Sequence, residues 1–142
     1  MNVGEWSAWL RLHNESAVCF IEPDERQSLF TAANSLDFAS VRLDLGDCRD
    51  EAGLFARFAA VFRFPEWFGD NWDALADCLG DLSWWPAPGY VLVLGNTMAF
   101  RQARPDAWRQ LLDLLSDCAD NWRGAAVPFW TFVTDPPDDA AG

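Results

Sequence analysis

FPEWFGDNWDALADCLGD, residues 64–81, joins a proline- and aromatic-rich loop to a short acidic helix. Phe64 precedes a proline, which disfavours helical backbone, and either Asp70 or Asn71 is a suitable N-cap for a helix over about 71–80. At about 100° per residue, one face of this helix collects its apolar side chains, Leu75, Cys78 and Leu79. That face predicts packing against a core which the flanking segments must supply.

The flanking segments predict a sheet. Residues 39–45 alternate apolar with polar side chains, as in a half-buried strand, and YVLVL at 90–94 is a continuous apolar run, as in a central parallel strand. VPFWTFV, 127–133, indicates a third strand. Apolar residues recur with the helical period over about 51–62 and 105–120. This alternation of strands and helices predicts an α/β fold with a small, mainly parallel three-stranded sheet packed with helices.

The segments outside this pattern divide the chain into three parts. Residues 38–134 form the α/β domain. Residues 1–37 are an N-terminal extension which we expect to pack on the same domain, with AVCFI at 17–21 adding a strand or a hairpin. We expect residues 135–142, DPPDDAAG, to form a disordered tail.

Composition limits the classes of function. The chain has 142 residues and a net charge of −12, from 22 acidic residues and 10 basic residues that are all arginine. A nucleic-acid-binding protein needs a basic surface, so we expect no direct DNA or RNA binding. No apolar run has the length of a membrane span. The N-terminus lacks the layout of a secretory signal, and we expect a cytoplasmic protein with a basic protein partner.

The side chains that carry chemistry do not form a recognisable active site. The chain has four widely spaced cysteines, which we interpret as reduced thiols: Cys19, Cys48, Cys78 and Cys118. His13 is the only histidine, and no nucleophile elbow or phosphate-binding glycine loop is present. The acidic residues lack the spacing of a calcium or di-iron site. We therefore expect neither a metal nor a cofactor, and leave open whether Pro86 and Pro88 follow cis peptide bonds.

Asp73 and Asp77 lie one turn apart on the polar face of the acidic helix. Between Arg63 and Arg101 every charged side chain is acidic: Glu66, Asp70, Asp73, Asp77 and Asp81. A solvated polar face is the simplest interpretation of such a helix. The loop, however, brings Trp67 to the same helix end, and aromatic residues beside an uncompensated acidic patch favour a binding surface.

The string from Phe64 to Leu79 closely resembles the signature of the barstar family of ribonuclease inhibitors. That signature joins Pro-Glu-aromatic-aromatic-Gly-acid-Asn to Asp-Ala-Leu-x-Asp-Cys-Leu. The resemblance covers about residues 39–134 and leaves the N-terminal extension outside. It implies a non-catalytic, immunity-type protein that blocks the active site of a basic, extracellular-type ribonuclease or a related nuclease toxin, one copy to one, and so neutralises it.

The resemblance also implies which residues touch the partner. By match, Asp77 enters the phosphate-binding site of the nuclease, Asp73 supports it one turn earlier, and Asp117 adds a contact from the late helix. The remaining matched positions lie in the loop and at the start of the acidic helix: Trp67, Gly69, Asn71 and Trp72. Carboxylates suit a cationic site because they mimic phosphate and form strong bonds with arginine.

One departure from the family pattern keeps two alternatives open. Ala76 stands where family members often carry an aromatic residue, although Trp72 lies one turn away and supplies aromatic surface. The first alternative is a barstar-like interaction module for a different toxin or a non-nuclease partner. The second is a carbohydrate-active enzyme that uses Asp73 and Asp77 as paired carboxylates beside Trp67.

Overall fold

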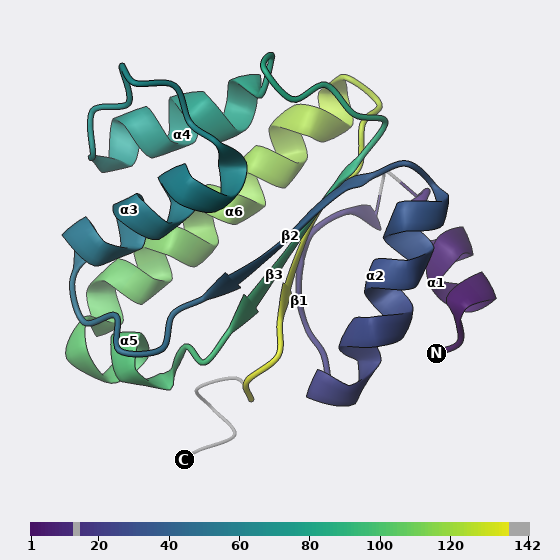
Figure 1. The fold of residues 1–142 in the computed structure, drawn as a ribbon, viewed down its shortest axis with the longest axis horizontal. Coiled ribbons are helices and arrows are strands. Elements are labelled where there is room, and N and C mark those ends of the chain that lie inside the picture. The colour runs from purple at the N-terminus through teal and green to yellow at the C-terminus, as the bar shows by residue number, and fades with distance from the viewer. Residues whose placement is uncertain (13–14, 137–142) are drawn as a thin grey trace.

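The computed structural model describes residues 1–12 and 15–136, which form a four-stranded parallel sheet between two layers of helices (Figure 1). The strands are β1 (Val18–Phe20), β2 (Ala39–Asp44), β3 (Tyr90–Gly95) and β4 (Phe129–Val133), in the spatial order β1-β4-β3-β2. All three pairings are parallel, so the prediction of an α/β fold with a mainly parallel sheet is confirmed. The sheet has four strands rather than three, because the segment at 17–21, which was expected to add a strand or a hairpin, contains β1, and β1 pairs with β4.

The N-terminal extension forms one of the two helical layers. Helices α1 (Val3–Leu10) and α2 (Arg26–Ser35) lie together on one face of the sheet (Figure 1). Their buried side chains, which include Trp6 and Leu10, pack with β3 and β4 residues in a core of their own. The extension supplies a single strand rather than a hairpin, because α2 carries the chain across the sheet from β1 to the far edge.

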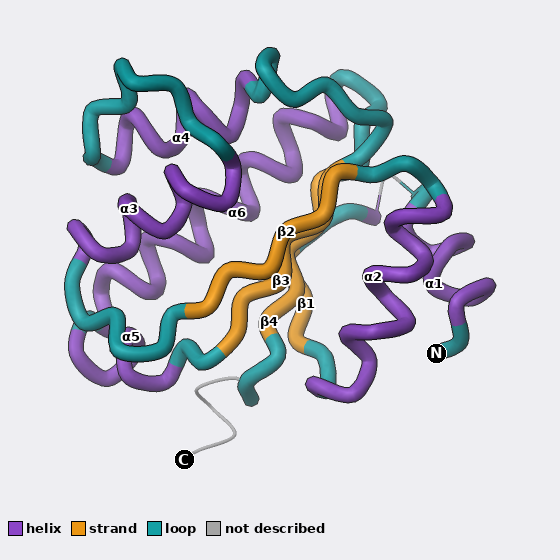
Figure 2. Tube along the Cα trace, in the orientation of Figure 1, coloured by secondary structure: helices purple, strands orange, loops and turns teal. Residues whose placement is uncertain are grey.

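The second layer covers the other face and carries the acidic helix. It consists of α3 (Glu51–Phe62), α4 (Trp72–Asp81), α5 (Met98–Ala103) and α6 (Pro105–Gly124), which lie on one side of the orange strands in Figure 2. Helices α3 and α4 lie within one residue of their predicted bounds. Helix α6 begins at the predicted residue but continues to Gly124 rather than ending near 120, and α5 was not predicted. Helices α3 and α6 pack against the sheet, and α4 packs against α6. The apolar faces of all three helices share one core, so their polar faces are left for solvent.

Local interactions explain where the helices before the site begin and end. The Asp50 carboxylate caps α3 by accepting the Gly53 backbone N–H at 2.8 Å. Arg63 ends α3 in the left-handed region, with φ 57°, and turns the chain into the loop that leads to α4. Leu82 ends α4 in the same way, with φ 47°.

Several sequence expectations concern connecting segments. Every peptide bond in the described part of the chain is trans, including those before Pro86 and Pro88. The predicted disordered tail, 135–142, lies outside the described residues apart from its first two, and His13 lies outside them as well.

None of the described helices combines the length and the apolar character needed to cross a bilayer.

Candidate functional site

The loop before α4 is held by aromatic packing that leaves one ring in solvent. Phe68 packs against Phe64, with ring centroids 4.8 Å apart, and against Phe55 of α3 at 6.5 Å. Its neighbour Trp67, in contrast, is 63% exposed. Its only described ring contact is edge-to-face with Trp84, at 6.4 Å between centroids. The loop therefore presents a large aromatic surface that the fold itself does not need to bury.

The turn from the loop into α4 is fixed by Asn71. Its side-chain oxygen accepts the Ala74 backbone N–H at 2.8 Å, and its amide donates to the Gly69 carbonyl at 3.1 Å. Asn71 is therefore the N-cap that the sequence left undecided between it and Asp70. A Cβ at Gly69 would lie 3.2 Å from the Asn71 amide nitrogen, so the close turn favours glycine.

Helix α4 divides into a buried and an acidic face. Leu75, Cys78 and Leu79 are fully buried, as their spacing predicts. Asp73 and Asp77 are exposed one turn apart, and neither takes part in any of the ion pairs of the described residues. The acidic face therefore carries charge that no described base neutralises.

Trp72 lies between the core and the surface. Its ring meets the Phe55 ring edge-on, with centroids 5.1 Å apart and planes at 85°. The residue is half-buried, and the rest of its surface faces α6. Trp72 thus supports the α3–α4 packing and also contributes to the surface beside the acidic residues.

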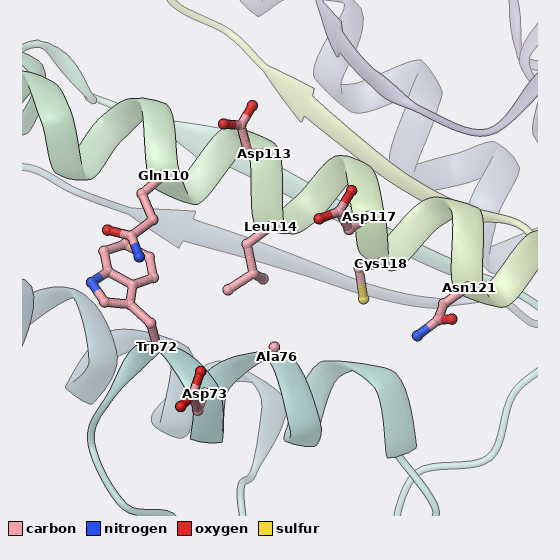
Figure 3. Close-up of a pocket in the computed structure, with 9 residues that line it drawn as sticks. All are labelled: Trp72, Asp73, Ala76, Gln110, Asp113, Leu114, Asp117, Cys118 and Asn121. Atoms are coloured by element: carbon pink, nitrogen blue, oxygen red, sulfur yellow. The ribbon is translucent and has the colours of Figure 1, made fainter.

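A groove of about 300 Å³ runs between α4 and α6 (Figure 3). Trp72 and Ala76 of α4 lie opposite Leu114 and Cys118 of α6. The groove is lined by Trp72, Asp73, Ala76, Gln110, Asp113, Leu114, Asp117, Cys118 and Asn121. It contains three carboxylates and no basic side chain.

The groove unites only part of the predicted site. It brings together Trp72, Asp73, Ala76 and Asp117 from two helices far apart in sequence. The other predicted residues do not line it: Trp67, Gly69 and Asn71 belong to the preceding loop and turn, and Asp77 is exposed on α4 beyond the groove. The predicted site residues therefore lie on the loop, on α4 and in the groove rather than in one cavity.

The end of α6 holds α4 in place. The Trp122 indole N–H donates to the Leu79 carbonyl at 2.9 Å, which satisfies one of the last carbonyls of α4. Leu79 also packs in the core that α6 covers. This contact fixes the spacing of the two helices, and with it the width of the groove.

Sequence reasoning missed the other groove residues of α6. Gln110, Asp113, Leu114 and Asn121 recur every three to four residues with Asp117, so they share one helix face. The sequence shows that spacing, but it does not show which other helix this face borders. The missing signal was the position of α4 beside α6, because only the folded chain shows which part of an exposed helix face borders a neighbour.

The thiols near the site are unsuited to nucleophilic chemistry. Burial raises the pKa of Cys118 to about 12, and burial also raises the pKa of Cys78. Both thiols therefore stay protonated near neutral pH. Within residues 1–12 and 15–136, no three histidine, cysteine or acidic side chains are grouped in a way that could hold a metal ion.

Comparison with family models relates the chain to a known family. A family model described as "Barstar (barnase inhibitor)" matches residues 38–134, which is more than half of the chain. The match includes the acidic helix, the loop before it and α6, and leaves out α1, β1 and α2. The comparison with curated proteins found no match.

Proposed function

The chain belongs to the barstar family of barnase inhibitors, and on that premise we propose that it is a non-catalytic inhibitor of a basic ribonuclease. The partner would be an extracellular-type ribonuclease or a related nuclease toxin, bound one to one and neutralised in the cytoplasm. The observation that carries the proposal is the unneutralised acidic surface of α4, bordered by the exposed ring of Trp67.

The chemistry of the partner explains the charge of this surface. A ribonuclease stabilises a polyanionic substrate, so its active site is cationic. Carboxylates fixed on a helix satisfy that site in the way phosphates do, and charge-assisted bonds to arginine are strong and often bidentate. The repulsion between neighbouring carboxylates in the free protein is relieved when the cations of the partner lie between them.

Each site residue has a proposed role. Asp77 occupies the phosphate site of the nuclease, while Asp73 and Asp117 pair with cations beside it. Trp67 covers these pairs and excludes water, which strengthens them. Gly69 and Asn71 act by shaping the turn, since the Asn71 side chain is already bonded within the chain.

Ala76 supports a second candidate, in which the fold and the surface are kept but the partner differs. Family members often carry an aromatic residue here, whereas this chain has a small exposed residue beside a groove. Such a change alters the shape that a partner must present. A different toxin, or a protein that is not a nuclease, is then the target.

An inhibition assay at two salt concentrations tests the proposal. A basic ribonuclease such as barnase is titrated with the chain while RNA cleavage is followed, and cytochrome c serves as a basic binding control without nuclease activity. We expect one-to-one inhibition, with an association rate that falls steeply as salt screens the charges over about 8 Å. Inhibition of no basic ribonuclease, together with capture of a basic protein that is not a nuclease, would favour the second candidate.

A further inference from the structure

Strand β1 is the outermost strand of the sheet, next to β4 (Figure 2). Hydrogen bonds join this segment to β4 from Ala17 to Ile21, beyond the three residues of the strand itself. In a parallel pair these bonds fall to alternate residues, so the N–H and C=O groups of Val18 and Phe20 point away from β4. Among the described residues, no strand lies on that outer side, and β1 therefore presents an open edge.

The β1 edge lacks the features that protect most edge strands from pairing. Charged side chains, prolines and bulges commonly serve this purpose. The opposite edge strand, β2, carries exposed Arg42 and Asp44, whereas residues 16–21, SAVCFI, contain neither a charge nor a proline. The register of β1 with β4 is regular, so no bulge turns the strand away. An apolar edge of this kind favours pairing with another strand.

Exposed apolar side chains flank this edge on both faces of the sheet. On the side of α5 and α6, the centroid of the Phe20 ring lies 5.5 Å from the Arg101 Cζ atom, and Phe20 is 38% exposed. On the opposite face, Trp9 of α1 contacts Trp130 of β4, with ring centroids 5.7 Å apart, and Trp9 is also exposed. Leu12, in the connection from α1 to β1, is exposed as well. Apolar surface beside an open edge is typical of a protein–protein interface.

A second copy of the chain complements this edge. When two β1 strands run antiparallel about a two-fold axis at Cys19, Val18 of each copy lies opposite Phe20 of the other. The outward N–H and C=O groups of the two strands then bond to one another. The side chains of this contact are apolar, so no charge is desolvated when the strands pair.

Charge at the ends of the strand also suits a second copy. The Arg123 guanidinium covers the start of β1, where it donates to the Ser16 carbonyl. In the antiparallel register, Ser16 lies opposite Glu22 of the other copy, a residue that is exposed and forms no ion pair with the described residues. Arg123 of one copy therefore meets Glu22 of the other at both ends of the paired strands. These contacts offset part of the repulsion between two chains of net charge −12.

We propose that the chain dimerises through β1, with a second copy of itself as the partner at this edge. The two sheets then form one continuous sheet, and neither copy leaves its β1 edge open. The inference goes beyond the proposed function and does not depend on it, because β1 lies outside residues 38–134 and contributes no residue to the proposed nuclease-binding surface.

Sedimentation velocity of the whole chain, in reducing buffer and at physiological salt, tests the dimer. We expect the mass to rise from that of one chain to that of two between micromolar and millimolar concentration. Phe20→Lys places a charge at the open edge and should raise the dimer Kd by about tenfold or more. Trp67→Lys makes the same change at an exposed aromatic residue of the loop before α4 and should leave the Kd unaltered. A wild-type chain that stays monomeric, or a dimer that Trp67→Lys disrupts and Phe20→Lys does not, would overturn the proposal.

A second pair of variants tests the charge contact. Glu22→Gln removes the proposed partner of Arg123 and should weaken the dimer about two- to fivefold. Glu66→Gln makes the same change at an exposed residue of the loop before α4 and should have no effect. Equal dimer Kd values for the two variants would overturn the antiparallel register.

Amide hydrogen exchange locates the contact at single residues. The Val18 and Phe20 amides should gain protection as the dimer forms. The Ile21 amide, which donates to the Val133 carbonyl at 2.9 Å within one chain, should be protected at every concentration. Phe20→Lys should remove the added protection of Val18 and keep that of Ile21, which shows that the variant is folded. Val18 and Phe20 amides that exchange equally fast in monomer and dimer would refute pairing through β1.

Discussion

Replacing Asp77 with alanine should stabilise the free protein while it removes the inhibitor's main contact. Asp77 is exposed within α4, with Asp73 four residues before it and Asp81 four residues after it. Each like-charge pair at this spacing costs a few tenths of a kcal/mol, and alanine is the better helix former by about half a kcal/mol. We therefore expect the free energy of unfolding to rise by about 0.5–1.5 kcal/mol.

The same replacement should weaken binding severely. Truncation of one partner of a buried, hydrogen-bonded charge pair costs about 2–5 kcal/mol of binding free energy, largely because the other charge is left buried and unpaired. Urea denaturation measures the first effect, and titration of the nuclease measures the second. The matched variant Asp77→Asn removes the charge but keeps the size of the side chain, so it should lose affinity with a smaller gain in stability.

A structural aspartate would behave in the opposite way. If Asp77→Ala unfolds at lower urea concentration and still inhibits, the carboxylate supports the fold and the reasoning is refuted. A loss of both stability and inhibition would also contradict it, because the exposed side chain has no ion pair in the described structure to lose.

Three further predictions concern the fold around the site. The Thr131 hydroxyl is buried in β4 without a hydrogen-bond partner in the described residues, so Thr131→Val should raise the free energy of unfolding by about 1 kcal/mol. Thr134→Val, which removes a hydroxyl bonded to the Leu94 carbonyl at 3.3 Å, is the control and should not stabilise. Trp122→Phe removes the hydrogen bond to the Leu79 carbonyl, and urea denaturation should show a loss of about 1 kcal/mol. Burial raises the pKa of Cys118 from 9.0 to about 12, so only the unfolded chain loses this proton above pH 9, and stability should fall as pH rises from there. Cys118→Ala should remove part of that slope in denaturation curves between pH 8 and about 11, and an unchanged slope would contradict the burial argument.

The parts of the fold that the sequence predicted are those with strong local signals. The period-two pattern around Val41 and the unbroken apolar run from Tyr90 each became a strand of the expected kind. Helix α3 matches its predicted range because a capping aspartate begins it and its apolar spacing is regular. Such signals depend on neighbours along the chain, so a single sequence contains them.

The sequence predicted an added N-terminal strand but not the helices α1 and α2, although one signal for α1 was present. Asn2 and Glu5 form a capping box at the start of α1, a pattern that the sequence shows. Helix α2 buries small residues, Ala32 and Ala33, whose periodicity is weak. The pairing of β1 with β4 joins segments more than a hundred residues apart, and no local pattern specifies such a partner.

The candidate site also contains residues that the sequence identified and residues that only the folded structure reveals. Residues on one short segment, such as Asp73 and Trp67, were identified from spacing and from the family resemblance. Asp113 was not identified, because it lies on the polar face of α6, and only the packing of α6 beside α4 shows that it borders a groove. The spacing of residues within one helix does not specify which other helices or strands that helix contacts.

The most direct test of the central claim is competition for the active site of a basic ribonuclease. A fluorescent mononucleotide is bound to the nuclease at its phosphate site, and the wild-type chain is then added in stepwise amounts. Phosphate mimicry by the acidic helix predicts that one equivalent of the chain displaces the nucleotide completely, and that Asp77→Ala displaces it only at far higher concentration. A chain that binds the nuclease while the nucleotide stays in place, or that displaces it equally well without Asp77, would contradict the account.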